Sequence, residues 1–485
     1  MITNLKPYSA YKDSGVEWLG QVPEHWEVVP LKRLAWFKSG AGFPVHHQGD
    51  ASAEIPFFKV SDMNIPGNEK YLRVCANTVS TTVAQGLGAT VFPAGTIVFP
   101  KVGGALLTNK RRIAANQCCI DNNMMACVAR NGNREFLFLV MSYIDLGQFA
   151  QPGPVPAISE GEVREIRVAL PSAAEQTAIV RFLDWAERRI RRVIRARKRR
   201  IKLLEEYKQA LIHQAVTGKI DVRTGQPYPA YKPSGVEWLG DVPEHWEVVP
   251  IKRAFSSMDY GISESGSDSG TIRLLTMGHL KNGQVIIPDT GGVDTVDPNL
   301  LLSPGDLLFN RTNSAELVGK VALFSGYVSP VTFASYLVRM RPTKENEPEF
   351  LNLVLNDAST LSRARREAIP SLHQSNLNPT RYGRLCIALP PKAEQQAILQ
   401  RLREQTENID AVIAATRREI ELLREYCTRL IADVVTGKVD VREVAAQLPE
   451  EPDEEDAPWM DDEERAQGET LNGEDDHATL SEEDE

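Results

Sequence analysis

The chain repeats itself, and this internal duplication constrains its fold more than any other feature of the sequence. Residues 11–33 and 231–253 are identical at 20 of 23 positions, and residues 206–223 and 425–442 are identical at 11 of 18. The two pairs of blocks recur at offsets of 220 and 219 residues, so two halves share one frame. Between the blocks lie residues 34–169 and 254–388, which are nearly equal in length but share little identity. One frame with two different inserts predicts two sites that perform the same task on different targets.

The two inserts favour an α/β fold. Short apolar runs such as 55–60, 96–99 and 306–309 are bounded by Gly, Pro and Asn, as is typical of strands. Residues 93–110 align with residues 303–320 without a gap, which pairs Lys101 with Arg311 and Lys110 with Lys320. We therefore expect the inserts to share a fold.

Two long helices are predicted, one after Leu170-Pro171 and one after Leu389-Pro390, because about forty residues without Pro or Gly follow each. Apolar residues recur at steps of three and four with a slip near Arg197 and Thr416, which is a heptad pattern with one stutter. Gly218 and Gly437 are expected to cap the helices at their C-terminal ends. Each helix should be about 60 Å long and should need the other as a partner. The predicted apolar seam contains Ile179, Leu183, Ala186, Ile190, Val193, Ile201, Leu204 and Leu211, then Ile398, Leu402, Ile409, Val412, Ile420, Leu423 and Leu430.

Charge is divided unevenly along the chain. The net charge is −10, but residues 445–485 alone carry −17, which leaves +7 for the rest. A mildly basic body suits a polyanionic partner, whereas the acidic, apolar-poor tail is expected to be disordered. The tail is either a solubilising end or a competitor of DNA for the basic surface.

The sequence has few features that indicate a membrane-bound or secreted protein. No apolar run approaches the roughly 20 residues that span a bilayer, and the N-terminus has no secretory core. We expect a cytoplasmic protein that does not contact a membrane. The six cysteines have neither C-x-x-C spacing nor the spacing of a disulfide framework.

Motifs for catalysis are missing from the sequence. It contains no G-x-x-x-x-G-K-[ST], no G-x-G-x-x-G that opens a helix after a strand, and no H-E-x-x-H. We therefore predict no catalytic residue, no metal and no nucleotide cofactor on this chain. Scattered carboxylates leave a metal-dependent nuclease site as the alternative.

Polar clusters that follow the predicted strands are candidates for DNA contact. Asn and Arg can form hydrogen bonds with the edges of adenine and guanine, and Lys, Ser and Thr can form them with phosphates. Loop solvation or turn formation is the alternative for each residue taken singly. The candidates are Lys59, Ser61, Asn64, Lys101, Asn109, Lys110, Arg111, Arg112, Thr276, His279, Asn282, Asn310, Arg311, Asn313 and Lys320.

Two further features have competing interpretations. Residues 188–202 contain ten Lys or Arg, while residues 408–412 of the second helix lack such a patch. Phosphate contact, partner contact and a solvated face are all open for this patch. Four tryptophans lie in the repeated frame, where packing is favoured over base stacking, because a residue that reads sequence should differ between the halves. They are Trp18, Trp26, Trp238 and Trp246.

Three motifs occur twice and in the same order: the frame SGVEWLGxVPEHWEVVPxKR, the helix start LPxxxEQxAI and the helix end TGKxDVR. Over about residues 8–442 this pattern closely resembles the specificity subunit of Type I restriction-modification systems. The resemblance implies two target-recognition domains, each clamping one half of a split double-stranded DNA site. It also implies an antiparallel coiled coil that sets the gap between the half-sites. Two modification (methyltransferase) subunits and two restriction (motor-nuclease) subunits would be partners, and S-adenosylmethionine, ATP and Mg2+ would belong to them.

The expected architecture is therefore α/β, with two pseudo-symmetric target-recognition domains separated by two long antiparallel helices. The acidic tail departs from the family pattern. A coiled-coil scaffold that ignores DNA is the alternative function, and a self-contained nuclease or methyltransferase is another. The predicted segments are 1–169 (first recognition domain), 170–222 (first helix), 223–388 (second recognition domain), 389–442 (second helix) and 443–485 (disordered tail).

Overall fold

The computed structural model describes residues 5–130, 133–151, 153–264, 266–267, 269–371 and 374–449. The chain divides into two compact units, the first made of Met1–Lys198 with Arg418–Glu485 and the second of Arg199–Arg417. Both long helices therefore contribute to both units. The acidic segment 450–485, predicted to be disordered, lies outside the described residues.

A five-stranded sheet and a three-stranded sheet form the sheet domain of the first unit. All four residues of the central strand β8 are buried. The larger sheet has the order β4 (Ala35–Ser39), β11 (Met124–Ala129), β8 (Ile97–Pro100), β9 (Arg112–Ala114) and β6 (Tyr71–Leu72). The smaller one has the order β10 (Cys119–Ile120), β5 (Ile55–Phe58) and β7 (Thr78–Val79).

The second unit repeats this topology, which confirms that the two inserts share a fold. Ile97 pairs with Ile113 across β8 and β9, and Leu307 pairs with Leu323 at the corresponding place in the second unit. The larger sheet here is β16 (Phe255–Tyr260), β25 (Leu337–Pro342), β21 (Leu307–Asn310), β23 (Val321–Leu323), β19 (Gln284–Val285) and β18 (Leu280–Lys281). The smaller sheet is β20 (Gly292–Val293), β17 (Ile272–Leu275) and β24 (Val331–Phe333), and a third sheet contains β22 (Thr312–Asn313), β27 (Gln374–Asn376) and β26 (Ile369–Ser371).

The repeated frame forms short strands that join each sheet domain to a long helix. In the first unit β3 (Glu27–Pro30) pairs antiparallel with β12 (Arg167–Leu170), the strand that leads into the first long helix. The second unit pairs β15 (Glu247–Pro250) with β28 (Cys386–Leu389) in the same way. Each frame also carries a small hairpin, β1 (Tyr11–Asp13) with β2 (Gln21–Pro23) and β13 (Tyr231–Pro233) with β14 (Asp241–Pro243).

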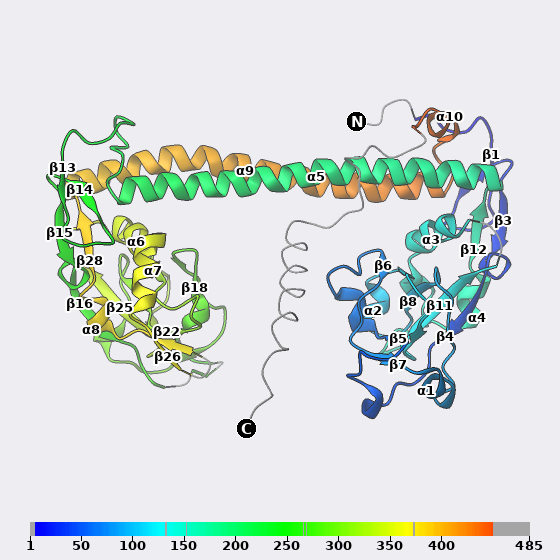
Figure 1. Cartoon of the computed structure of the whole chain (residues 1–485), viewed down its shortest axis with the longest axis horizontal. Helices are drawn as coiled ribbons and strands as arrows, with labels where there is room; N and C mark the ends of the chain where they lie inside the picture. The colour runs from blue at the N-terminus through cyan, green and yellow to red at the C-terminus, as the bar shows by residue number, and fades with distance from the viewer. Residues whose placement is uncertain are drawn as a thin grey trace, which may run out of the picture. The chain divides into compact units, whose positions relative to one another are not determined.

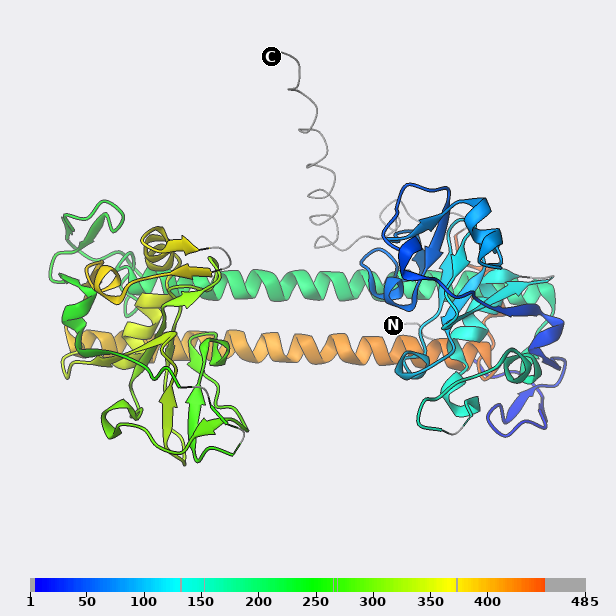
Figure 2. The same ribbon diagram turned by 90° about the horizontal axis from the view of Figure 1, so that it is seen from below.

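The long helices are α5 (Ala173–Val216) and α9 (Lys392–Val435), each of 44 residues, or about 66 Å at 1.5 Å per residue. They run antiparallel within each unit, where the two helix segments lie side by side (Figures 1 and 2). In the first unit Arg197 Nε and Nη2 each donate a hydrogen bond to a carboxylate oxygen of Glu419 at 2.9 Å. In the second unit Lys208 donates to Asp410 at 2.6 and 2.7 Å.

The predicted seam is largely confirmed at the ends of the helices, where the sheet domains pack on them. Ile179, Leu183 and Ala186 of α5 are buried, as are Ile398 and Leu402 of α9. One seam position was wrong, because Val193 is 41% exposed. The half-buried Ile194, four residues after Ile190, takes its place at the stutter.

The helix ends confirm the predicted glycine caps. At the end of α5 the Gly218 N–H donates to Ala215 O and the Lys219 N–H donates to Gln214 O, the two bonds of a Schellman motif. Gly218 and Gly437 have φ of +68° and +78°. A Cβ at Gly218 would lie 2.5 Å from Pro243 Cδ, and one at Gly437 would lie 2.3 Å from Pro23 Cδ. Each helix end is thus pressed against a frame proline.

Shorter helices complete the units, and two of them pack on the long helices. Phe136 and Val140 of α3 (Arg134–Tyr143) share a buried core with Ile179, while Phe350 and Leu351 of α6 share one with Ile398. None of the helices in the described part of the chain combines the length and apolarity needed to cross a membrane. The other α-helices are α1 (Thr81–Gly86), α2 (Gly104–Leu107), α4 (Glu160–Glu165), α6 (Pro348–Asn356), α7 (Ala358–Arg366), α8 (Pro379–Tyr382) and α10 (Arg442–Ala446). The 3-10 turns are η1 (Leu31–Arg33), η2 (Val45–His47), η3 (Val60–Asn64), η4 (Leu146–Phe149), η5 (Ile251–Ala254), η6 (Met277–His279) and η7 (Pro298–Leu300).

The start of the predicted disordered tail is instead ordered. Helix α10 (Arg442–Ala446) includes the first four residues of the segment 443–485 that the sequence predicts to be disordered. Ala445 is 2% exposed and packs with the neighbouring Val441 in the core of the first unit. These few apolar residues bury enough surface to hold the chain as far as Pro449, before the acidic run begins.

We expect that replacing either cap glycine by alanine will destabilise its unit by about 2–4 kcal/mol, the sum of a strained positive φ and a clash with proline. Gly225→Ala is the matched control, because Gly225 has φ of +74° but open space around its Cα. It should cost only about 1 kcal/mol. Urea unfolding of Gly218→Ala, Gly437→Ala and Gly225→Ala measures the difference, and equal losses would show that the contact with proline is unimportant.

Candidate DNA-binding surfaces

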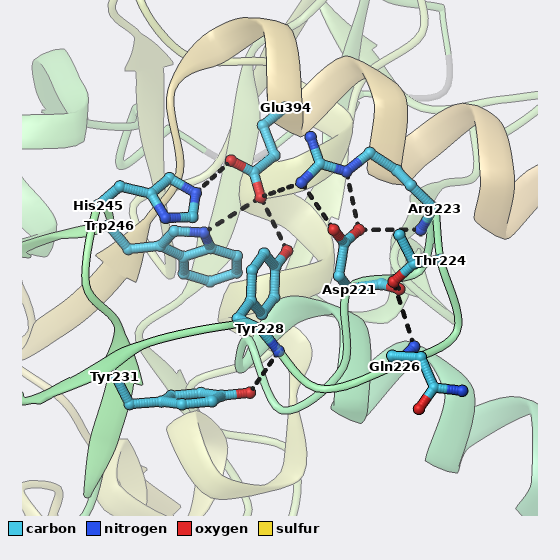
Figure 3. Close-up of polar contacts among 9 residues, drawn as sticks. All are labelled: Asp221, Arg223, Thr224, Gln226, Tyr228, Tyr231, His245, Trp246 and Glu394. Carbon is cyan, nitrogen blue, oxygen red and sulfur yellow. Dashed lines mark hydrogen bonds and ion pairs between the residues drawn. The ribbon is translucent and has the colours of Figure 1, made fainter.

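A buried carboxylate at the start of α9 is the centre of a polar cluster in the second unit (Figure 3). Glu394 is 7% exposed and accepts hydrogen bonds from Tyr228 Oη at 2.8 Å and from Trp246 Nε1 at 3.4 Å. Its other oxygen lies 2.7 Å from His245 Nε2. Arg223 Nη2 lies 3.6 Å from the carboxylate and also donates to Asp221 at 2.8 Å.

The first unit repeats the cluster around Glu175 at the start of α5. Tyr8 Oη donates to Glu175 at 2.7 Å, and His25 Nε2 lies 3.0 Å from the same carboxylate. Arg442 lies 3.8 Å away and pairs with Asp440. The histidines come from the frame, the glutamates from the helix start, and the Asp-x-Arg pairs from the helix end, so all three repeated motifs meet at one place.

These two clusters are structural junctions. Burial and the hydrogen bond to glutamate raise the pKa of Tyr8 and of Tyr228, so both phenols stay protonated and donate. Trp26 and Trp246 are fully buried beside them, which confirms packing rather than stacking for this pair. Across the described ranges, no group of three or more His, Cys, Asp or Glu could hold a metal ion.

The exposed candidates of the first unit gather around the turn η3, which follows β5. The Lys59 N–H donates to Asp62 Oδ2 at 2.7 Å, and this bond shapes the turn. Ser61 and Asn64 are exposed on it. Lys110 Nζ donates to Asn64 Oδ1, and Arg112 Nη2 donates to Met63 O at 3.1 Å, so two distant segments meet here. The Lys59 and Lys101 ammonium groups donate to Gln48 and Ser39 at 2.8 and 2.9 Å.

Arg111 does not belong to this surface, although its neighbours do. It is 3% exposed, and its guanidinium donates to Met141 O at 3.1 Å, to Asn109 Oδ1 at 2.7 Å and to Ile144 O at 3.3 Å. Burial lowers its pKa to about 10, which still leaves it charged at neutral pH. Asn109, with φ of +52°, forms the turn that holds Arg111. The prediction of DNA contact at Arg111 is therefore withdrawn, because the fold encloses the side chain.

In the second unit the turn η6 occupies the position of η3. The Thr276 N–H donates to His279 Nδ1 at 2.9 Å, as the Lys59 N–H does to Asp62. Burial, aided by the nearby Lys281, lowers the pKa of His279. The ring is therefore neutral at pH 7 with Nδ1 as acceptor, which leaves Nε2–H as a donor.

Arg311 is the most clearly positioned cation of the second unit. Its guanidinium lies 5.1 Å from the Tyr260 ring centroid and donates to Asn376 Oδ1 at 3.2 Å. Asn313 and Lys320 are half-exposed nearby in the chain. A half-buried guanidinium held against an aromatic ring is well suited to planar recognition of a base edge or phosphate.

Two candidates of the second unit have structural positions. Asn310 is 2% exposed at the end of β21, so it cannot reach a ligand, and its predicted DNA contact is withdrawn. Asn282 is exposed, but with Gly283 it forms the tight turn between β18 and β19, at φ of 51° and 75°. Its residue type is explained by the turn.

Sequence reasoning missed the residues that position these candidates. Ser39, Gln48, Tyr260 and Asn376 hold the cations described above, but each comes from a distant segment and has no motif of its own. Tyr8 and Tyr228 of the junctions were also missed. A longer repeat search would have found them, because Pro-Tyr-x-Ala-Tyr-Lys occurs at 7–12 and 227–232.

Comparison with known proteins supports the resemblance. Residues 23–203 match the family described as Type I restriction modification DNA specificity domain. The putative MjaX specificity subunit of Methanocaldococcus jannaschii is 27% identical over 39% of this chain and 44% of its own length. The EcoKI specificity subunit of Escherichia coli is 22% identical over 56% of this chain and 58% of its own length. The matched regions thus span about half of these relatives. A solved chain from a study of complex assembly and conformational transition of the type I R-M system has the same fold, with a TM-score of 0.60 and 16% identity over 85% of this chain and 98% of its own.

We expect Arg111→Met to destabilise the first unit by about 2–4 kcal/mol, because the Met141 and Ile144 carbonyls lose their buried donor. Lys110→Met should change stability by less than about 0.5 kcal/mol and instead weaken DNA binding, reducing the salt slope by about one. Urea unfolding and a DNA titration at several salt concentrations measure the two effects. A stable Arg111→Met variant that loses only DNA affinity would show that Arg111 contacts DNA and is not a structural residue.

Proposed function

Since the chain belongs to the family of Type I restriction-modification specificity subunits, we propose that it reads a split double-stranded DNA target with its two recognition domains. It then directs methyltransferase and restriction subunits to that target. The chain has no active site of its own in this proposal, and S-adenosylmethionine, ATP and Mg2+ act on the partners. Its place of action is the cytoplasm.

One observation carries the proposal, namely that matched backbone positions hold different side chains in the two units. The turns η3 and η6 have the same capping bond, but the exposed positions two and five residues after the N-cap are Ser61 and Asn64 in one unit and Gly278 and Lys281 in the other. The strands β8 and β21 are followed by Lys101 and Arg311. Equal frameworks with unequal polar groups are what two readers of different half-sites require.

Joining two readers on one scaffold increases their combined affinity. A half-site of a few base pairs gives little discrimination alone, but binding at one half-site raises the effective concentration of the second reader. The continuous helices α5 and α9 would act as the ruler between half-sites. Inserting or removing residues in both would then change the spacer.

A second duplicated feature supports protein partners. Leu203 and Tyr207 on α5 are each 56% exposed, and the corresponding residues of α9, Leu422 and Tyr426, are 56% and 40% exposed. Apolar side chains four residues apart form one patch on a helix. An identical patch in each unit fits two copies of one partner, which in this family would be the methyltransferase subunit.

The alternative is a coiled-coil scaffold without sequence-specific DNA binding. It shares the helix patches with the main proposal but gives no role to the unlike polar sets of the recognition domains. A titration with random duplex at low salt separates the two, since a scaffold would not bind.

We predict that the double variant Arg311→Ala, Asn313→Ala will lose the preference for one half-site, with a penalty of about 10–100-fold, and keep the other. The variant Asn64→Ala, Lys110→Ala should have the opposite effect. Asn310 is left unchanged because its burial would confound the result. Selection from a random duplex library reports both half-sites at once, and parallel loss of both preferences would contradict two independent readers.

We also predict that Leu203→Asp with Tyr207→Asp will reduce the number of bound methyltransferase subunits from two to one, and that Leu422→Asp with Tyr426→Asp will do the same. Native mass spectrometry counts the subunits. Tyr327→Asp with Val328→Asp changes two exposed side chains in the loop between β23 and β24 and is the control. Two subunits still bound to the helix variants would exclude the patches as docking sites.

A further inference from the structure

One face of α5 carries a row of arginines that the duplicated scaffold does not require. We call Arg181, Arg188, Arg192 and Arg195 the basic stripe. Their spacing of seven, four and three residues places them on one helix face, opposite the buried Ile179. Arg192 is exposed and the other three are half-exposed, and Arg188 also pairs with Asp184.

The second copy of the helix lacks the stripe. At the offset of 219 residues, the corresponding positions of α9 are Gln400, Glu407, Ala411 and Ala414. The two helices otherwise repeat their starts, their seam and their caps. Four arginines at exposed or half-exposed positions of one copy therefore serve something that only one copy meets.

The last described residues of the chain contact the first residue of the stripe. Arg181 Nη2 donates to Leu448 O at 2.5 Å and to Pro449 O at 3.1 Å, both in the first unit. Helix α10 fixes this exit, since Val441 and Ala445 are buried. The last described residue before the acidic tail, Pro449, thus contacts the stripe at Arg181.

The charge and the length of the tail both match the basic stripe. Residues 450–485 contain eighteen Asp or Glu and one Arg465. The stripe runs about 21 Å along the helix, a span that six or seven extended residues cover. A segment so acidic, whose preceding residues contact Arg181, has a high local concentration at the side chains of the stripe.

We propose that residues 450–485 bind the basic stripe of α5 and compete there with DNA phosphates. The tail is then a built-in polyanion that weakens non-specific DNA binding, which lacks base contacts to offset the competition. The binding of the tail stands on the contacts above, whereas the competition with DNA rests on the proposed function.

The contact is tested without DNA. A labelled peptide of residues 450–485 is titrated into a chain that ends at Pro449. We expect saturable binding at 50 mM salt that weakens at least about tenfold at 200 mM. Replacing the four stripe arginines by Gln should weaken it by a similar factor. The control replaces four exposed cations of the same unit by Gln: Lys12, Arg33, Arg164 and Arg167. Absence of binding, or equal loss in the control, would overturn the proposal.

The competition is tested with random duplex and the full chain. Ending the chain at Pro449 should tighten binding about tenfold at low salt, and so should Asp461→Asn, Asp462→Asn, Glu463→Gln and Glu464→Gln combined, which leaves α5 intact. In the stripe variant, shortening the chain should change affinity less than twofold. Equal tightening in both backgrounds would mean that the tail acts only through net charge. If no form binds duplex, the proposed function fails, and the peptide titration still decides the tail contact.

Discussion

The buried glutamates that start the two long helices are the interaction on which the rest of the structure depends. A carboxylate removed from water costs several kcal/mol unless charged or hydrogen-bonded partners replace the lost solvation. Glu175 and Glu394 obtain those partners from Tyr, His and Arg residues that lie elsewhere in the chain. Each junction therefore fixes, at one point, the direction of a helix, the position of the frame and the end of the other helix.

The junctions also explain why each unit is assembled from distant segments. In the second unit Asp221, Arg223 and Tyr228 are neighbours along the chain. In the first unit the same positions are taken by Asp440 and Arg442 from one end of the chain and Tyr8 from the other. The Lys6–Asp440 bridge brings those ends together. The repeating module thus runs from the end of one long helix to the start of the next, and closing it in the first unit requires bringing the two ends of the chain together.

Sequence reasoning succeeded where local chemistry determines the structure and failed where tertiary partners do. Gly218 and Gly437 were predictable because few residues other than glycine readily adopt the positive φ that ends a helix. The seam at Ile179 and Leu183 follows from the periodicity of the apolar residues. Arg111 and Asn310 were assigned to the surface because their types suit DNA. The acceptors that bury Arg111 are carbonyls about thirty residues away, which no local pattern encodes. Val193 failed for a related reason, since the stutter shifts the seam by one residue and the sequence alone does not fix where.

The duplication makes the chain its own comparison. Positions that agree and are buried, such as Glu175 and Glu394, meet the needs of the shared fold. Positions that agree and are exposed, such as Tyr207 and Tyr426, have no packing reason to agree, and they are where the proposed partner subunits would dock, one copy on each unit. Positions that differ on matched backbone, such as Lys101 and Arg311, are free of both constraints, and there the two halves can diverge in target without loss of fold. The basic stripe is the extreme case, because it is at least half-exposed, confined to one copy and unnecessary for folding of the other. A feature confined to one of the two copies fits a ligand that is present once per chain, as the acidic tail is.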